Sequence, residues 1–154
     1  MNNNFIFELS VEPVSLHDRI ESWELSHHFY PQNPYWSEEG EPLDVSDRQD
    51  ALDCLKHELP QGYSMNLVDE TINIINPDLY LTETINRLQT INPSLPIDYP
   101  LGWWKKDVCL FCDILIYFDK ELFTLHEFLL YMISRNKEDN IQKLYVGGVF
   151  WYLC

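Results

Sequence analysis

The sequence predicts an α+β fold: a single globular domain over residues 1–154, with a mixed or antiparallel sheet, about four helices and a C-terminal β-hairpin. Three observations lead to this prediction. Apolar residues alternate at the start of the chain, they recur at helical spacing in four segments, and a Gly-Gly pair separates two β-rich stretches at the end. Strands joined by hairpins among irregularly spaced helices favour α+β over a doubly wound parallel sheet.

The first sixty residues predict one strand and two helices. Apolar residues alternate over Phe5–Val11 with the period of a half-buried strand. Ser15 opens an S-x-x-D capping box, and apolar residues follow at helical spacing to about His28. A second helix is predicted from Ser46 and ends before Pro60.

The middle of the chain gives weaker patterns. Gly62–Ile75 is compatible with one or two short strands, and Thr82–Ile91 predicts a third helix that stops at an Asn-Pro pair. Proline-rich stretches over residues 29–43 and 92–102 predict irregular segments, because proline removes a backbone donor.

The last third predicts a strand, a helix and a hairpin. Val108–Phe118 is rich in β-branched and aromatic residues, as in a central strand covered on both faces. Thr124 opens a capping box with Glu127, and the helix that follows ends near Asn136.

The end of the chain predicts a β-hairpin. Two β-rich stretches, 141–146 and 149–153, flank Gly147 and Gly148. Glycine adopts positive φ without steric cost, so this pair suits a two-residue primed turn.

Negative charge is concentrated in the first part of the chain. Residues 1–60 hold 13 Asp and Glu against 3 Lys and Arg, a net −10, whereas residues 101–154 hold 7 against 6, a net −1. The whole chain carries −15. Such a surface repels nucleic acid and anionic membranes, and it attracts a basic protein surface. We therefore expect no direct nucleic-acid or membrane binding.

The start of the chain and its cysteines predict a cytoplasmic protein. The first ten residues contain no Lys or Arg and include Glu8, unlike a secretory signal. The longest apolar stretch, Val108–Phe118, is interrupted by Asp113 and is about half as long as a membrane span. Four cysteines are expected to remain reduced thiols.

Cys109 and Cys112 form a C-x-x-C pair, which in other settings is a redox motif. On a strand, three steps of about 3.3 Å separate their Cα atoms by about 10 Å, whereas a disulfide needs less than about 7 Å. We expect two buried thiols. No second pair of ligands at zinc spacing accompanies them, so no metal or other cofactor is predicted.

Histidine and glutamate form a stripe on the first predicted helix. His17, Glu21, Glu24 and His28 follow one another at helical spacing. Such a stripe is compatible with a metal site or acid and base roles, but a solvated helix face has the same pattern and is favoured here. The sequence contains no hydrolase, nucleotide-binding or dehydrogenase motif, and we expect no enzymatic activity.

A cluster of aromatic residues next to carboxylates is the strongest candidate for a binding surface. Tyr and Trp supply much of the affinity in protein interfaces, and acidic groups accelerate encounter with a basic partner. The alternative is a loop whose rings pack on the core and whose acids are solvated. The candidate residues are Tyr30, Tyr35, Trp36, Glu38, Glu39, Glu41, Asp44, Asp47 and Asp50.

These observations favour a non-enzymatic protein that occludes a basic partner. Immunity proteins that neutralise nuclease-type toxins, and inhibitors of nucleic-acid-handling complexes, share this acidic character, because their targets display positive clefts. Two alternatives remain open: a small enzyme around Cys109 and Cys112 or the His17 and His28 stripe, and a structural subunit that uses residues 141–154 as an interface.

Overall fold

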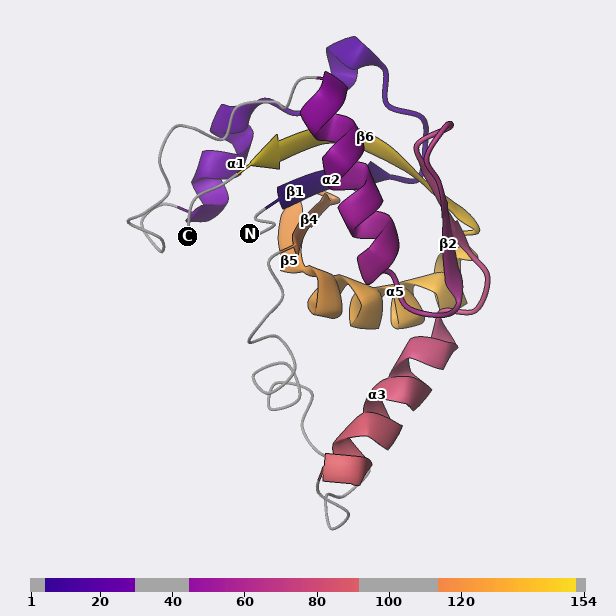
Figure 1. The fold of residues 1–154 in the computed structure, drawn as a ribbon. Coiled ribbons are helices and arrows are strands. Elements are labelled where there is room, and N and C mark those ends of the chain that lie inside the picture. Colours follow the sequence, from indigo (N-terminus) through magenta and orange to yellow (C-terminus); the bar gives the residue numbers. More distant parts are fainter. Residues whose placement is uncertain (1–4, 30–44, 92–113, 152–154) are drawn as a thin grey trace.

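A six-stranded mixed sheet organises the molecule (Figure 1), seen in a computed structural model that describes residues 5–29, 45–91 and 114–151. The strand order is β2-β3-β6-β1-β4-β5. β1 and β4 pair in parallel, and the other neighbours pair antiparallel. The strands are β1 Phe5–Ser10, β2 Tyr63–Asn66, β3 Thr71–Ile74, β4 Ile114–Phe118, β5 Glu121–Thr124 and β6 Lys143–Trp151. The predicted α+β class with a mixed sheet is confirmed.

Four α-helices lie within the described ranges, together with one short 3₁₀ helix. Their bounds are η1 Leu16–Asp18, α1 Ser22–Phe29, α2 Val45–Glu58, α3 Asp78–Ile91 and α5 Leu125–Asp139. In Figure 1, α2 and α5 lie against the sheet, and α3 projects away from its lower end. None of the helices in the described ranges is long and apolar enough to cross a membrane.

The sheet has a core on each face. The larger core joins the inner faces of α2 and α5 to the sheet and includes Leu52, Leu55, Phe128 and Phe7. The smaller core joins α1 to the opposite face and contains Ile6, Leu25, Tyr117 and Phe150. β1 is therefore buried on both sides, and its predicted half-buried character is wrong.

The predicted helix after Thr124 is confirmed at its start. The Thr124 hydroxyl accepts a hydrogen bond from the Glu127 backbone N–H at 3.1 Å, which is the cap that the sequence indicates. α5 extends past the predicted end near Asn136 and stops where Asn140 adopts the left-handed conformation, with φ 48°. The second and third predicted helices are also present, and α3 begins four residues before Thr82, at Asp78.

The helix predicted from Ser15 to His28 is broken. Leu16–Asp18 forms only a 3₁₀ turn, and α1 begins at Ser22. The Ser15 hydroxyl donates to the Asp18 carboxylate at 2.6 Å and makes no cap bond to the backbone. In the break between η1 and α1, the Ile20 backbone N–H donates a hydrogen bond to the carboxylate of Glu8 in β1, at 3.2 Å.

The predicted C-terminal hairpin is wrong, because β6 continues through Gly147 and Gly148 as one strand. Phe7 pairs with Val149 and Leu9 pairs with Val146, so β6 contains one extra residue opposite Glu8. This is a β-bulge. The glycines are needed there for space, since a Cβ on Gly147 would lie 2.2 Å from the Glu8 Oε1.

A primed turn does occur elsewhere, between β4 and β5. Asp119 and Lys120 have φ values of 50° and 64°, the signature of a type I′ connection. The predicted strand Val108–Phe118 is described from Ile114 onward and is an inner strand of the sheet. Its partner β5 was not predicted from the sequence, because Asp-Lys is a weak turn signal beside Asn-Gly or Gly-Gly.

Candidate functional site

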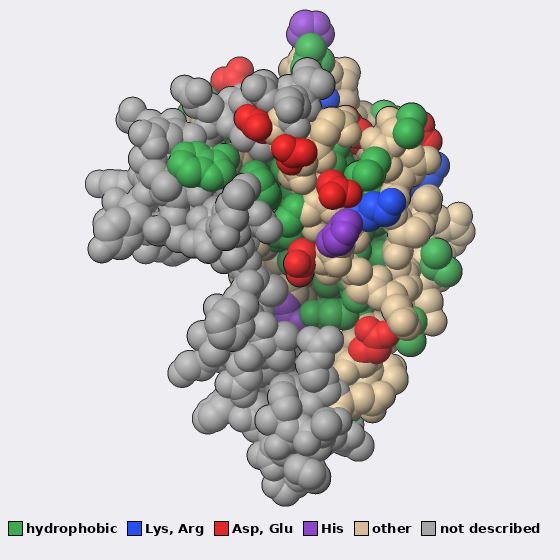
Figure 2. Space-filling view, viewed as in Figure 1, with side chains coloured by type: hydrophobic (Ala, Val, Ile, Leu, Met, Phe, Trp, Pro, Cys, Tyr) green, Lys and Arg blue, Asp and Glu red, His purple; other side chains and the backbone are tan. Residues whose placement is uncertain are grey.

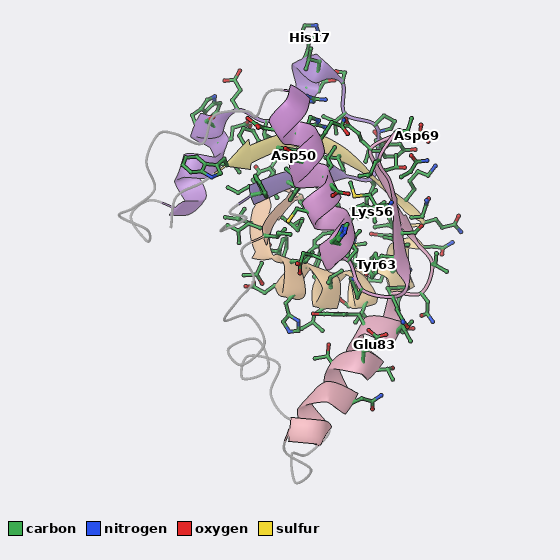
Figure 3. The ribbon with its side chains drawn as sticks, viewed as in Figure 1. His17, Asp50, Lys56, Tyr63, Asp69 and Glu83 are labelled. Carbon is green, nitrogen blue, oxygen red and sulfur yellow. The ribbon has the colours of Figure 1, made fainter. Side chains whose placement is uncertain are left out.

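The exposed face of α2 carries the described part of the predicted binding surface. Asp47 and Asp50 are both exposed, and Asp53 continues the same face one turn further on. Figure 2 shows acidic side chains distributed as separate groups over this side of the molecule, and Figure 3 locates Asp50 on α2. The other seven predicted residues lie outside the described ranges: Tyr30, Tyr35, Trp36, Glu38, Glu39, Glu41 and Asp44.

Arg48 does not neutralise these acids because it points inward. Its side chain is 9% exposed and forms a two-nitrogen ion pair with Glu70, the residue before β3. Nη2 lies 2.5 Å and Nε 3.1 Å from Glu70 Oε2. Arg48 is therefore paired with a carboxylate from another element, and not with the exposed Asp50 on its own helix.

The C-terminal end of α2 has a different balance of charges. Lys56 and His57 lie in its last turn, where positive charge interacts favourably with the helix dipole. The His57 ring approaches the Asp53 carboxylate at 4.0 Å, and Figure 3 shows Lys56 further along the helix than Asp50. Positive side chains thus join the acidic ones toward the end of α2, whereas Asp47 and Asp50 lie in its first half.

A cleft lies next to the start of α2, and the sequence did not predict it. Its volume is about 720 Å³, and it opens to solvent between η1, the start of α1 and β6. Arg19 and Arg48 contribute its positive charge. The lining residues are Leu16, His17, Arg19, Ile20, Glu21, Ser22, Trp23, Arg48, Gly148, Val149 and Phe150.

Glu8 lies buried beside this cleft, with 8% of its surface exposed. Its Oε1 accepts hydrogen bonds from two backbone N–H groups, that of Gly148 at 2.8 Å and that of Ile20 at 3.2 Å. Because a buried carboxylate is costly without donors, these bonds account for its place in the fold. The sequence did contain a signal for this site: one glutamate among the apolar residues of Phe5–Leu9, together with two adjacent glycines elsewhere.

Arg19 differs from the other charged groups around the cleft. Its Nε is buried and has no hydrogen-bond partner in the described part of the chain. Burial lowers the pKa of the Arg19 guanidinium below its usual value, and the like charge of Arg48 lowers it further, against the opposing effects of Glu70 and Glu8. The nearby carboxylates thus compensate the positive charge of the Arg19 guanidinium only in part.

The predicted stripe of histidines and glutamates is not a single helix face. His17 lies in η1 and Glu21 precedes α1, so the break at residues 19–21 separates them from Glu24. Glu24 instead closes the start of α1 by accepting from the Glu21 backbone N–H at 2.7 Å. No group of three or more metal-binding side chains occurs among the described residues. Cys109 and Cys112 lie outside the described ranges.

Comparison of the chain with protein-family models, with curated proteins and with solved structures finds no match.

Proposed function

We propose that this protein is a cytoplasmic binding protein that uses the acidic face of α2 to occlude a basic surface on a partner protein. A positively charged cleft of a nucleic-acid-handling protein is the class of partner that fits, as for an immunity protein that neutralises a nuclease-type toxin. Opposite surface charge accelerates encounter and disfavours wrong partners.

The inward orientation of Arg48 is the observation that carries this proposal. Asp47 and Asp50 would face a neighbouring positive charge if Arg48 lay on the same side of the helix. Instead Arg48 is buried and paired with Glu70, while both aspartates are exposed. Arg48 therefore does not neutralise the exposed Asp50 carboxylate, and this supports a role for Asp50 in attracting a basic partner.

The test uses affinity capture from the native host, followed by kinetics with the purified captured protein. The intact wild-type chain is compared with the double variant Asp47→Asn/Asp50→Asn. We expect the variant to associate several-fold more slowly at low salt, with the difference shrinking as salt increases, because screening removes long-range attraction. Inhibition of the captured protein's activity on nucleic acid is measured in parallel.

The matched control removes two exposed carboxylates from other elements, as Glu121→Gln/Glu138→Gln. It changes the net charge by the same amount and should bind nearly as the wild type does. Equal association rates and salt dependence for the α2 variant and the wild type would exclude α2 as the docking surface. Capture of a partner without a basic surface would exclude the occlusion model.

A further inference from the structure

Most acidic and arginine side chains at the cleft between η1, α1 and β6 already form ion pairs or hydrogen bonds within the protein. Arg48 is held by Glu70, with Nη2 at 2.5 Å from Oε2. Glu8, whose carboxylate touches the cleft wall at Gly148, accepts two backbone hydrogen bonds. The Glu21 carboxylate accepts from the Trp23 indole N–H at 2.7 Å.

Arg19 is the exception among these acids and arginines, within the part of the chain that the structure describes. It lines the cleft, and its buried Nε donates no hydrogen bond. A buried donor without an acceptor costs about 1 to 3 kcal/mol. A hydrogen-bond acceptor on a bound molecule would recover this free energy, and a negatively charged acceptor would recover the largest part of it.

The remaining walls of the cleft are apolar and partly aromatic. Leu16 is 71% exposed and Trp23 is 60% exposed, while Val149 and Phe150 form part of the inner wall. The bond from its indole N–H to Glu21 holds the Trp23 ring at the entrance. Such a ring favours a ligand with a flat apolar group, because a flat group can stack against the face of the ring.

We propose that this cleft binds a small molecule that carries an oxyanion, a carboxylate or a phosphate, on a flat apolar body, with the oxyanion bound by the Arg19 guanidinium. Planar nitrogen donors of arginine match both oxyanions. The site is independent of the partner surface on α2. A chain of net charge −15 repels anions in general, so binding of an anion must come from a local site.

The test follows the Arg19 Nε–H signal in nitrogen-15 NMR spectra, assigned by its loss in Arg19→Lys. The probes are benzoate and phenyl phosphate, with benzamide as the neutral analogue and inorganic phosphate as the oxyanion alone. We expect both aromatic anions to shift the Arg19 signal at millimolar concentration and benzamide to leave it unchanged. The tighter of the two anions identifies the oxyanion class.

Two variants and one control make the result decisive. Arg19→Gln lacks the reporting signal, so its binding is followed at the indole N–H signal of Trp23, and it should weaken the aromatic anions at least about tenfold. Trp23→Ala should weaken phenyl phosphate while leaving inorganic phosphate unchanged. Lys56→Gln removes an exposed cation from α2 outside the cleft and should bind like the wild type. The proposal is overturned if no probe shifts the Arg19 signal, if benzamide binds as well as benzoate, or if a folded Arg19→Gln protein retains wild-type affinity.

Discussion

Carboxylates in this protein occupy two contrasting environments, represented by Glu8 and by the exposed face of α2. Glu8 is 8% exposed and is held by backbone donors from β6 and from the segment before α1. Asp50 on α2 is exposed and lies on a face from which Arg48 has turned away. The contrast predicts that the buried Glu8 carboxylate contributes to the stability of the fold, whereas the exposed Asp50 carboxylate contributes little.

The largest effect expected from this comparison is on the free energy of unfolding. Glu8→Ala removes the acceptor of two backbone N–H groups near the sheet's bulge and should cost about 3 kcal/mol, as for charged hydrogen bonds at buried sites. Asp50→Ala should change stability by less than about 0.5 kcal/mol. Urea unfolding of both variants measures the difference.

Gly147→Ala tests the same contact from the opposite side. A Cβ at this position would lie 2.2 Å from Glu8 Oε1, so the carboxylate would have to leave its place. We expect a loss of about 2 to 3 kcal/mol, as for an overpacked core site. If Glu8→Ala and Asp50→Ala are equally mild, the distinction between the two environments fails.

Ion pairs of different exposure should also differ in their contribution to stability. Arg48 pairs with Glu70, and the two side chains are 9% and 24% exposed. Arg135 on α5 pairs with Asp119 and Asp139, which are 50% and 46% exposed. The hydrogen bonds that Arg135 donates to Asp119 and then to Asp139 raise the pKa of its guanidinium, but its surroundings remain open to solvent.

Arg48→Met should therefore cost about 2 kcal/mol, because it leaves Glu70 partly buried without its partner. Arg135→Met should cost less than about 1 kcal/mol, since solvent screens exposed pairs. A double-mutant cycle with Glu70→Gln separates the pair interaction from packing. Similar losses for the two arginines would show that the inward position of Arg48 has no particular structural role.

Sequence patterns predicted the local structure better than the contacts between distant segments. The capping boxes at Ser15 and Thr124 have the same spacing, yet only Thr124 caps a helix. The helix after Thr124 has a core to pack against, whereas Leu16, directly after Ser15, is 71% exposed. Local propensity therefore decided the outcome only where tertiary packing agreed with it.

The candidate site likewise combines features that the sequence predicts with contacts that it does not. Helical spacing places Asp47 and Asp50 on one side of α2, so their exposure follows from the sequence. The pairing of Arg48 does not, because Glu70 lies 22 residues away in another element. The sequence predicted a turn at Gly147 and Gly148, because positive φ is the commonest reason for glycine. In the structure the pair instead allows the Glu8 side chain to approach closely. This contact was not predictable from local sequence, because Glu8 lies 140 residues before Gly148.

The smallest effect is expected at Tyr63, a third kind of buried polar group. Its hydroxyl is buried without a hydrogen-bond partner in the described part of the chain, unlike the carboxylate of Glu8. Tyr63→Phe should leave stability at neutral pH unchanged or raise it by up to about 1 kcal/mol, since no hydrogen bond is lost. Tyr145→Phe, on β6, is the control for the substitution itself.

The pH dependence of Tyr63→Phe gives a second readout. Burial raises the pKa of the Tyr63 hydroxyl, with smaller contributions from Tyr80 and Asp78. Above the unfolded pKa of about 10, Tyr63 ionises in the unfolded chain while it stays neutral in the fold, so the wild type loses stability as pH rises through this range. The phenylalanine variant lacks this loss, and its advantage should grow between neutral pH and about pH 11 in urea unfolding. A constant difference across that range, or a large loss of stability at neutral pH, would mean that the hydroxyl is solvated or bonded in the folded protein.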